Sequence, residues 1–268
     1  NLLPQFQRPR TFDYDKATDG LKQMLWGFFK KIVVADSCAV GVENIFSNYP
    51  SMSGGLLFLG GVLFAFQIYG DFSGYSDIAI GTARLFGIDL MRNFNIPYFS
   101  RNISEFWSRW HISLTTWFRD YIYISLGGNR EGRLRTLRNT LIVFLVSGIW
   151  HGANWTFVCW GLYHALLIIV FFLLGVRRQP TVVAANSVLP SAKECIQMAV
   201  TFFLVVIGWI IFRSENMSMA YHYIVRMFTT PWTDFSAKMF IDFAVLKNAL
   251  IGCAIMILVE WIQRRKEH

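Results

Sequence analysis

Two apolar runs flank four small or polar residues within 141–174: LIVFLVSGIW at 141–150, HGAN at 151–154 and WTFVCWGLYHALLIIVFFLL at 155–174. The second run has the roughly 20 residues that a helix needs to cross a membrane, whereas the first is too short to span comfortably. Irregular backbone at membrane depth is tolerated only where protein or a water-filled cavity surrounds it. We therefore predict a hairpin of short or tilted helices whose break, at 151–154, lies inside the protein.

The composition of the whole chain indicates an integral membrane protein. Of its 268 residues, 54% are hydrophobic and 16% are charged, against roughly a quarter charged in an ordinary soluble domain. The chain contains 25 Phe, 10 Trp and 10 Tyr. These values exclude a disordered chain, a coiled coil and an ordinary cytosolic enzyme. They fit an apolar surface that faces lipid.

The net charge of +8 comes from 25 basic and 17 acidic residues. In a soluble domain this excess would suggest a nucleic-acid partner. Here the basic clusters adjoin apolar runs, so we assign them to membrane topology and to anionic lipid head groups, with no nucleic-acid partner. Two cytoplasmic loops are predicted from arginine clusters: Arg130, Arg133, Arg135 and Arg138 in the first, and Arg177 and Arg178 in the second.

The apolar runs together predict six or seven membrane helices of unequal length. Residues 20–46 have a helical pattern but carry Lys30, Lys31 and Asp36, which suits a tilted or short span. Runs within 54–88, at 196–212 and at 240–262 have the composition of spans. Residues 217–228 are typical of an interfacial amphipathic helix, and 179–195 of a polar linker.

Residues 103–126 have the pattern of one amphipathic helix that follows a loop at 92–102. Its aromatic stripe includes Phe106, Trp110 and Trp117, whereas Glu105 and Arg109 lie mainly off the stripe. We therefore predict a helix with a charged face rather than a plain lipid-facing span.

His151 is the first candidate for chemistry because it begins the break between the two apolar runs. Gly152 and Ala153 let other groups approach the imidazole closely. Burial disfavours the charged imidazolium, so we expect a neutral ring, which can act as a general base. The alternative is a structural histidine that hydrogen-bonds the broken backbone, but ionisable groups inside a membrane favour a functional role.

Two further histidines lie in apolar surroundings. His111, on the shoulder of the aromatic stripe, either orients a substrate or shares a proton, or it is a histidine packed among aromatic rings. His164 is predicted to be a satisfied core residue, since it lies on an apolar helix.

Asp71 and Asp77 interrupt the apolar run at 54–88 and should face protein or a water-filled cavity. They are candidates for a proton path or a cation site. A structural role is favoured, in which they cap helices or pair with Arg84 or Arg119.

The four cysteines are far apart and show no CxxC or Cys/His ligand spacing. They are therefore predicted to be small buried residues, with no disulfide framework and no metal site. The sequence also lacks GxSxG, Walker A, HExxH and GxGxxG motifs, so any chemistry centres on histidine.

Three blocks of sequence resemble signatures of the membrane-bound O-acyltransferase (MBOAT) family. The first extends over 98–130 and contains EFWSRWHISL (105–114) and WFRDY (117–121). The second is GIWHGANWTF (148–157), and the third is QIYGDFSGYSD (67–77). The blocks are most similar to the bacterial branch of alginate O-acetyltransferases, and teichoic acid D-alanyl transferases are nearer relations than the animal lipid enzymes.

The resemblance implies an all-α, polytopic membrane domain over 1–268, with tilted and broken helices around a central cavity. It also implies that this chain lacks the N-terminal helices of full-length members. The family's catalytic histidine corresponds to His151 and its second characteristic histidine to His111. The three blocks supply further candidates for substrate binding or for the cavity wall: Trp107, Asn154, Trp155, Asp71, Tyr75 and Arg119.

The implied activity is transfer of an acetyl group from a cytosolic thioester to hydroxyls of an extracytoplasmic polysaccharide, at a bacterial inner membrane. The donor is acetyl-CoA or an acyl carrier protein, no cofactor is bound, and a separate exported or membrane-anchored acetyltransferase assists. His151 would take the hydroxyl proton and His111 would orient or polarise the reacting groups. The arginines at 130–138 would attract donor phosphates, or only set topology.

Three alternatives remain open at this point. The same fold could transfer D-alanine to teichoic acid. A proton-coupled transporter could use Asp71, Asp77 and His151 as a relay. A scaffold could dock the exported partner without itself reacting.

Overall fold

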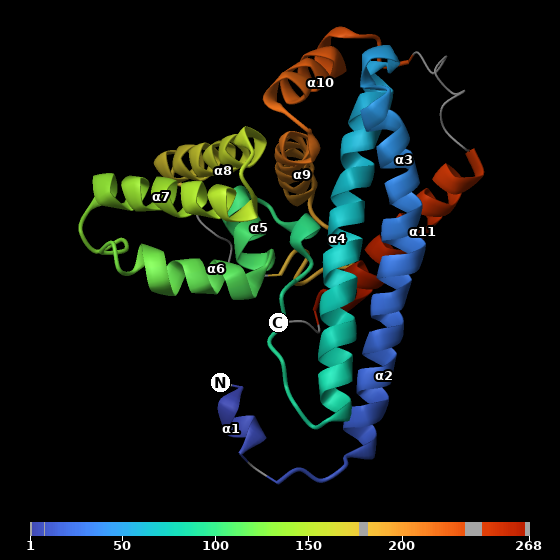
Figure 1. Ribbon diagram of the computed structural model, residues 1–268, viewed down its shortest axis with the longest axis vertical. Helices are drawn as coiled ribbons and strands as arrows, with labels where there is room; N and C mark the ends of the chain where they lie inside the picture. Colours follow the sequence, from blue (N-terminus) through green and yellow to red (C-terminus); the bar gives the residue numbers. More distant parts are fainter. Residues whose placement is uncertain (1, 8, 177–181, 234–242, 266–268) are drawn as a thin grey trace.

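The computed structural model describes residues 2–7, 9–176, 182–233 and 243–265, and every regular element among them is a helix (Figure 1). The all-α prediction is therefore confirmed. Among these residues four helices are long and apolar enough to cross a membrane. They are α4 (Gly54–Leu85), α8 (Trp155–Leu173), α9 (Ala192–Arg213) and most of α11 (Phe243–Gln263).

Four spans are fewer than the six or seven predicted, because a π-helical stretch divides the first predicted span into helices of 15 and 12 residues, and because charge lowers the hydropathy of the helix at 133–151. α7 (Arg133–His151) begins at an arginine and also includes Arg135 and Arg138. Those arginines were expected in a loop. Arginine is a good helix former, and no glycine or proline follows Gly132 until Gly148, so the helix extends through them. The second predicted basic loop, at Arg177 and Arg178, lies outside the described residues.

The N-terminal part of the chain forms a rod that runs along α4 (Figure 1). After the short α1 (Leu3–Phe6), the rod consists of α2 (Tyr14–Phe28), a π-helical stretch (Phe29–Ala35) and α3 (Asp36–Ser47). A Cβ atom on Gly27 would lie 2.7 Å from the carbonyl oxygen of Gly74 on α4. Glycines at this crossing therefore let the two backbones approach closely.

The π-helical stretch brings two lysines to the acids of α4. Lys30 Nζ forms an ion pair with Asp77, and Lys31 Nζ lies 2.9 Å from Asp71 Oδ1. The favoured structural role of both aspartates fits these pairs, but their predicted arginine partners were wrong. π-helical turns are wider than α-helical ones and often mark specialised sites.

Both arginines proposed as partners pair elsewhere. Arg84 binds Asp19 on α2, and Arg119 Nε donates to Asp120 Oδ1 at 2.8 Å. The sequence identified the need for counter-charges, but not which of the nearby cations supplies them.

The predicted single helix at 103–126 is broken. α5 (Ile103–Arg109) ends at Trp110, and α6 (Ile112–Phe118) continues into a π-helical stretch (Arg119–Tyr123). His111, between the two helices, has the left-handed φ of +44°. Such a conformation is uncommon for a non-glycine residue and ends helical repetition locally.

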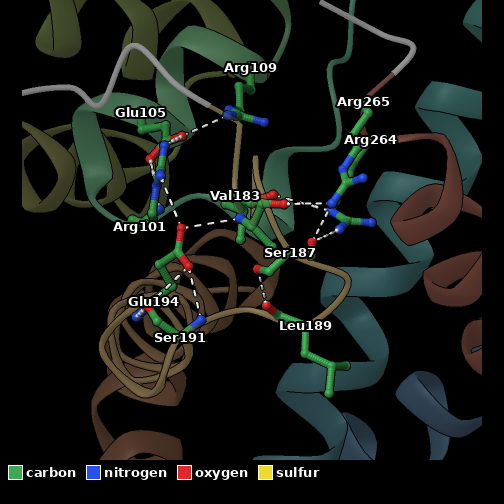
Figure 2. A network of polar contacts seen from close by, with 11 residues as sticks. Arg101, Glu105, Arg109, Val183, Ser187, Leu189, Ser191, Glu194, Arg264 and Arg265 are labelled. Carbon is green, nitrogen blue, oxygen red and sulfur yellow. Dashed lines mark hydrogen bonds and ion pairs between the residues drawn. The ribbon is translucent and has the colours of Figure 1, made fainter.

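The first part of the predicted charged face, Glu105 and Arg109, is buried, whereas Arg119 and Asp120 further along are exposed. Glu105 is fully buried and accepts hydrogen bonds from Arg101 Nη2 at 3.0 Å and from Arg109 Nη2 at 2.7 Å (Figure 2). Two arginines on one carboxylate supply the hydrogen bonds that make such burial tolerable.

The same network reaches the linker and α9. Arg101 Nη1 lies 3.4 Å from Glu194 Oε1, and Glu194 forms a capping box with Ser191 at the start of α9 (Figure 2). Arg264 donates to the carbonyl oxygens of Val183 and Ser187 at 3.2 and 3.0 Å. The described part of the predicted polar linker is thus held by Arg101, just before α5, through Glu194, and by Arg264, just after α11.

The remaining predictions along the chain are largely confirmed. α10 (Met217–Thr229) matches the amphipathic stretch, and α9 and α11 match the last two runs, although residues 240–242 lie outside the described residues. Cys38 and Cys253 are buried free thiols with their Sγ atoms 3.6 Å apart. Cys195 is exposed, which corrects the expectation of a buried residue there.

Candidate active site

A cavity of about 350 Å³ lies between α4, α5–α6, α7, α8 and α9 and is lined mainly by aromatic and aliphatic side chains. We call it the histidine cavity, because both His111 and His151 line it. Its other polar lining residues are Ser104, Ser108, Thr115, Arg119, Tyr123, Thr140 and Ser147. No Asp or Glu is among the described residues that line it.

His151 is the last residue of α7, which ends because Gly152 has a φ of +153°. Asn154 then caps α8, its side-chain oxygen accepting from the backbone N–H of Thr156 at 3.1 Å. The break predicted at 151–154 is therefore confirmed, and it exposes the histidine at a helix end beside the cavity. A glycine is needed at 152, since a side chain would be strained at this φ.

Close contact between α7 and α8 fixes the position of this break. A Cβ atom on Gly148 would lie 2.5 Å from the carbonyl oxygen of Phe157, and one on Gly161 would lie 2.3 Å from that of Phe144. The two helices therefore pack backbone to backbone, one turn before His151.

Aromatic rings surround His151. Its ring centroid lies 5.1 Å from those of Trp160 and Phe212, nearly perpendicular to both. Burial lowers the pKa of His151, with a smaller contribution from the charge of His111. His151 lies outside the four candidate spans. A neutral imidazole with an available lone pair can accept a proton.

His111 reaches the cavity from the break between α5 and α6. Its ring meets the Phe72 ring edge to face at 4.7 Å, and its Nδ1 lies 3.4 Å from Ser113 Oγ. Burial lowers the pKa of His111, which also lies outside the four candidate spans. Two histidines from separate helix breaks thus meet in one apolar space, both favoured as neutral rings.

Trp107 and Arg119 also line this cavity. Trp107 Nε1 donates to His164 Nδ1 at 3.3 Å, and His164 is fully buried, as predicted for a core residue. Its Nε2 has no hydrogen-bond partner in the described part of the chain. The prediction that this histidine is fully hydrogen-bonded is therefore only half correct. Arg119 pairs with Asp120 and is well exposed, which places it at the rim.

Four sequence candidates do not line the histidine cavity. Asn154 caps α8 and donates to the carbonyl oxygen of Glu215 at 2.8 Å, while Trp155 is 74% exposed. Asp71 pairs with Lys31 and Tyr75 is 68% exposed.

Helical periodicity explains the last two misses. Residues 71 and 75 share one face of α4, whereas residues 68 and 72 share another. Ile68 and Phe72 line the cavity, and neither was singled out from the sequence. The third sequence block therefore contributes to the cavity through its apolar residues rather than through its acids.

Other cavity residues missed by sequence reasoning are Thr115 and Phe118 on α6, Thr140 and Ser147 on α7, and Phe212 on α9. A helical wheel for 133–151 would have placed 140, 147 and 151 on one face at steps of seven and four. No sequence pattern indicated Phe212, because only the tertiary fold brings the end of α9 to the histidine cavity.

A second cavity of about 310 Å³ lies between α2, α4, the 92–96 loop and α11. We call it the charged cavity. Lys30 and Asp77 form an ion pair in its wall, as do Arg84 and Asp19. Across it, Tyr69 donates to Glu260 Oε1 at 2.5 Å. Asp77 lines this cavity, which fits the expectation that it faces protein or a water-filled space.

Among the described residues, no three His, Cys, Asp or Glu side chains lie close enough together to bind a metal ion. The basic residues at 130–138 are partly engaged within the protein. Arg135 pairs with Glu131, and Arg138 donates to Asn139 Oδ1 at 3.0 Å.

Comparison with known proteins agrees with this geometry. The profile of the membrane-bound O-acyltransferase family matches residues 20–211, and the chain belongs to this family. A "probable alginate O-acetylase" of Pseudomonas aeruginosa is 42% identical over 85% of this chain and 42% of its own length. A peptidoglycan O-acetyltransferase of Helicobacter pylori is 38% identical over 82% of this chain and 41% of its own length.

A teichoic acid D-alanyltransferase of Bacillus subtilis is less similar, at 32% identity over 56% of this chain and 40% of its own length. The chain therefore spans about two fifths of the length of these relatives. Family membership and the described helices together make it a multi-pass membrane protein.

Proposed function

We propose that the protein transfers an acetyl group from a cytosolic thioester to hydroxyl groups of an extracytoplasmic polysaccharide. The observation that carries the proposal is the pair His111 and His151, which line one apolar cavity in a chain of the O-acyltransferase family. The acetyl-transferring relatives act, by their names, on alginate and on peptidoglycan, which supports a glycan acceptor.

The lining of the histidine cavity favours acetyl over D-alanyl transfer. A D-alanyl group carries an ammonium, whose burial is costly without an opposite charge. The one charged residue among the described lining residues is Arg119, which would repel that ammonium. An acetyl group is neutral and small, and it suits an apolar wall.

The proposed reaction needs one base. The acceptor hydroxyl gives its proton to His151 as its oxygen attacks the thioester carbonyl. The C–S bond then breaks, and the leaving thiolate takes up a proton, which restores the neutral histidine. Removing a positioned base lowers the rate by on the order of 10²–10⁴.

The remaining parts of the proposal concern molecules outside this chain. The donor is acetyl-CoA or an acyl carrier protein thioester on the cytosolic side of a bacterial inner membrane. An exported or membrane-anchored acetyltransferase completes delivery to the polymer.

Replacing His151 by alanine in the full gene tests the proposal. We expect O-acetyl esters on the exopolysaccharide to disappear while the amount of protein in the membrane stays constant. His222→Ala is the matched control, because His222 is exposed on α10 and bonds only to Ser218 among the described residues. It should leave ester content unchanged.

The same cells separate the alternatives. Esters that persist in His151→Ala would overturn the histidine-base mechanism and favour a docking scaffold. Flux driven by a pH gradient, without thioester turnover in purified membranes, would favour a transporter. Lost esters with retained thioester hydrolysis would place His151 in delivery to the acceptor rather than in cleavage of the donor.

A further inference from the structure

A short hydrogen-bond chain leads from His111 to two residues that do not line the histidine cavity, Ser113 and Asn93. His111 Nδ1 lies 3.4 Å from Ser113 Oγ, and Ser113 Oγ lies 2.5 Å from Asn93 Oδ1. The backbone N–H of Ser113 also donates to Asn93 Oδ1, at 3.3 Å. Neither Ser113 nor Asn93 has a role in the proposed reaction.

The direction of each bond in this chain follows from the groups involved. A backbone N–H can only donate, so the atom of Asn93 that faces Ser113 must be the amide oxygen. That oxygen can only accept, so the single proton of the Ser113 hydroxyl points to it. The hydroxyl oxygen is then left as an acceptor, so a hydrogen bond between it and His111 Nδ1, 3.4 Å away, requires the hydrogen to be on Nδ1.

We propose that Ser113 and Asn93 are positioning residues that hold neutral His111 in the tautomer with hydrogen on Nδ1. Nε2, on the far side of the ring, then carries the lone pair. His111 lines the histidine cavity, and Nδ1 is the ring nitrogen that lies against Ser113. Which ring nitrogen of a histidine carries the hydrogen is commonly determined by the hydrogen bond that the other nitrogen makes.

The loop that contains Asn93 is itself fastened on both sides of the helix break. The carbonyl oxygen of Asn93 accepts from the N–H of Ile112 at 2.9 Å, and the N–H of Asn95 donates to the carbonyl oxygen of Arg109 at 2.9 Å. These bonds hold the left-handed residue His111 between them. The loop therefore fixes both the backbone and the ring of this histidine.

The tautomer narrows what His111 does in the proposed reaction, on which this part of the inference rests. A neutral ring with its lone pair on Nε2 accepts a hydrogen bond in the cavity and donates none there. It therefore orients a hydroxyl or thiol by accepting a hydrogen bond from it. It does not polarise the thioester carbonyl by donating one.

Nitrogen-15 NMR of histidine-labelled protein in lipid nanodiscs tests the tautomer without any substrate. The His111 signals are assigned by their absence in His111→Gln. We expect wild-type His111 to carry its hydrogen on Nδ1. In Ser113→Ala the tautomer ratio should shift toward hydrogen on Nε2 by about two- to tenfold, the factor that corresponds to one ordinary hydrogen bond. Ser113→Thr keeps the hydroxyl and should restore the wild-type spectrum.

Wild-type protein with hydrogen on Nε2 would overturn the proposal, as would a Ser113→Ala spectrum identical to wild type. Ser125→Ala is the matched control, since its hydroxyl bonds to the carbonyl oxygen of Tyr121 away from both histidines. In the transfer assay, Ser113→Ala should lower kcat in proportion to the fraction of the Nδ1–H tautomer that is lost, and leave the KM for the donor unchanged. A confirmed tautomer without any transfer activity would refute the proposed function and leave this assignment standing.

Discussion

The histidine cavity and the charged cavity are similar in size and share an aromatic wall, but they bury opposite kinds of groups. Phe72 faces the first and contacts Phe94, which lines the second, at 5.0 Å between ring centroids. On one side of these rings lie two neutral imidazoles among apolar side chains. On the other lie Lys30, Asp77 and Glu260, joined to partners on neighbouring helices.

The difference separates groups that hold the fold from groups that are free to react. A buried charge is tolerated only with a partner, and the contacts Arg84–Asp19 and Tyr69–Glu260 join α2 and α11 to α4. A buried neutral histidine needs no counter-ion and keeps a lone pair available. Perturbing the two cavities should therefore damage different properties of the protein.

The largest effect is expected in the charged cavity. Asp77→Ala would leave Lys30 buried without this partner, and removing one member of a buried pair costs about 3–5 kcal/mol. We expect a clear loss of thermal stability in detergent, measured as the fraction that remains monodisperse after heating. Ester formation per folded molecule should not change, because Asp77 does not line the histidine cavity.

A matched comparison comes from Asp89→Ala. It removes the partner of Lys16 in an exposed ion pair, in which Lys16 Nζ lies 2.8 Å from Asp89 Oδ2. Such pairs contribute about 0–1 kcal/mol. Equal losses of stability in the two variants, or lost activity in folded Asp77→Ala protein, would contradict the division between the cavities.

A smaller effect is expected where α7 meets α8. Gly148→Ala would place a Cβ atom 2.5 Å from the carbonyl oxygen of Phe157, so the two helices must separate. Overpacking of this kind costs about 1–3 kcal/mol. Because His151 lies one turn further on, the transfer rate should fall in protein that is still folded.

The neighbouring substitution Ile149→Ala serves as the control, since Ile149 is exposed and makes no such approach. Stability and rate are measured on both variants. A Gly148→Ala protein with the wild-type rate would show that the α7–α8 contact does not position His151.

The smallest effect concerns pH. Burial lowers the pKa of His151 and of His111, so both rings stay neutral below the ordinary histidine pKa of about 6.5. A base acts only when unprotonated, so kcat/KM should stay level as the pH falls through that value and decline only at lower pH. Assays in proteoliposomes across this pH range measure the midpoint of the decline in kcat/KM. A midpoint at or above the ordinary histidine pKa would contradict the burial of the base.

Much of this molecule follows from its sequence. Apolar composition and run length predicted an all-helical membrane protein, because a helix satisfies its own backbone in lipid. HGAN at 151–154 predicted a break, since only glycine adopts the φ found at Gly152 without strain. His151 was singled out by its place at this break and His111 by its place beside the aromatic stripe, and the family resemblance pointed to both; the structure brings both to one cavity.

Tertiary structure alone decided which groups face one another. The break at His111 depends on Asn93, 18 residues earlier in the chain, and the partners of Asp71 and Asp77 come from a π-helical stretch about 40 residues before them. Glu105 was assigned to a charged face, but two arginines allow its burial. Periodicity and propensity report on a helix and its own neighbours, whereas these contacts join distant segments and exist only once the helices have packed.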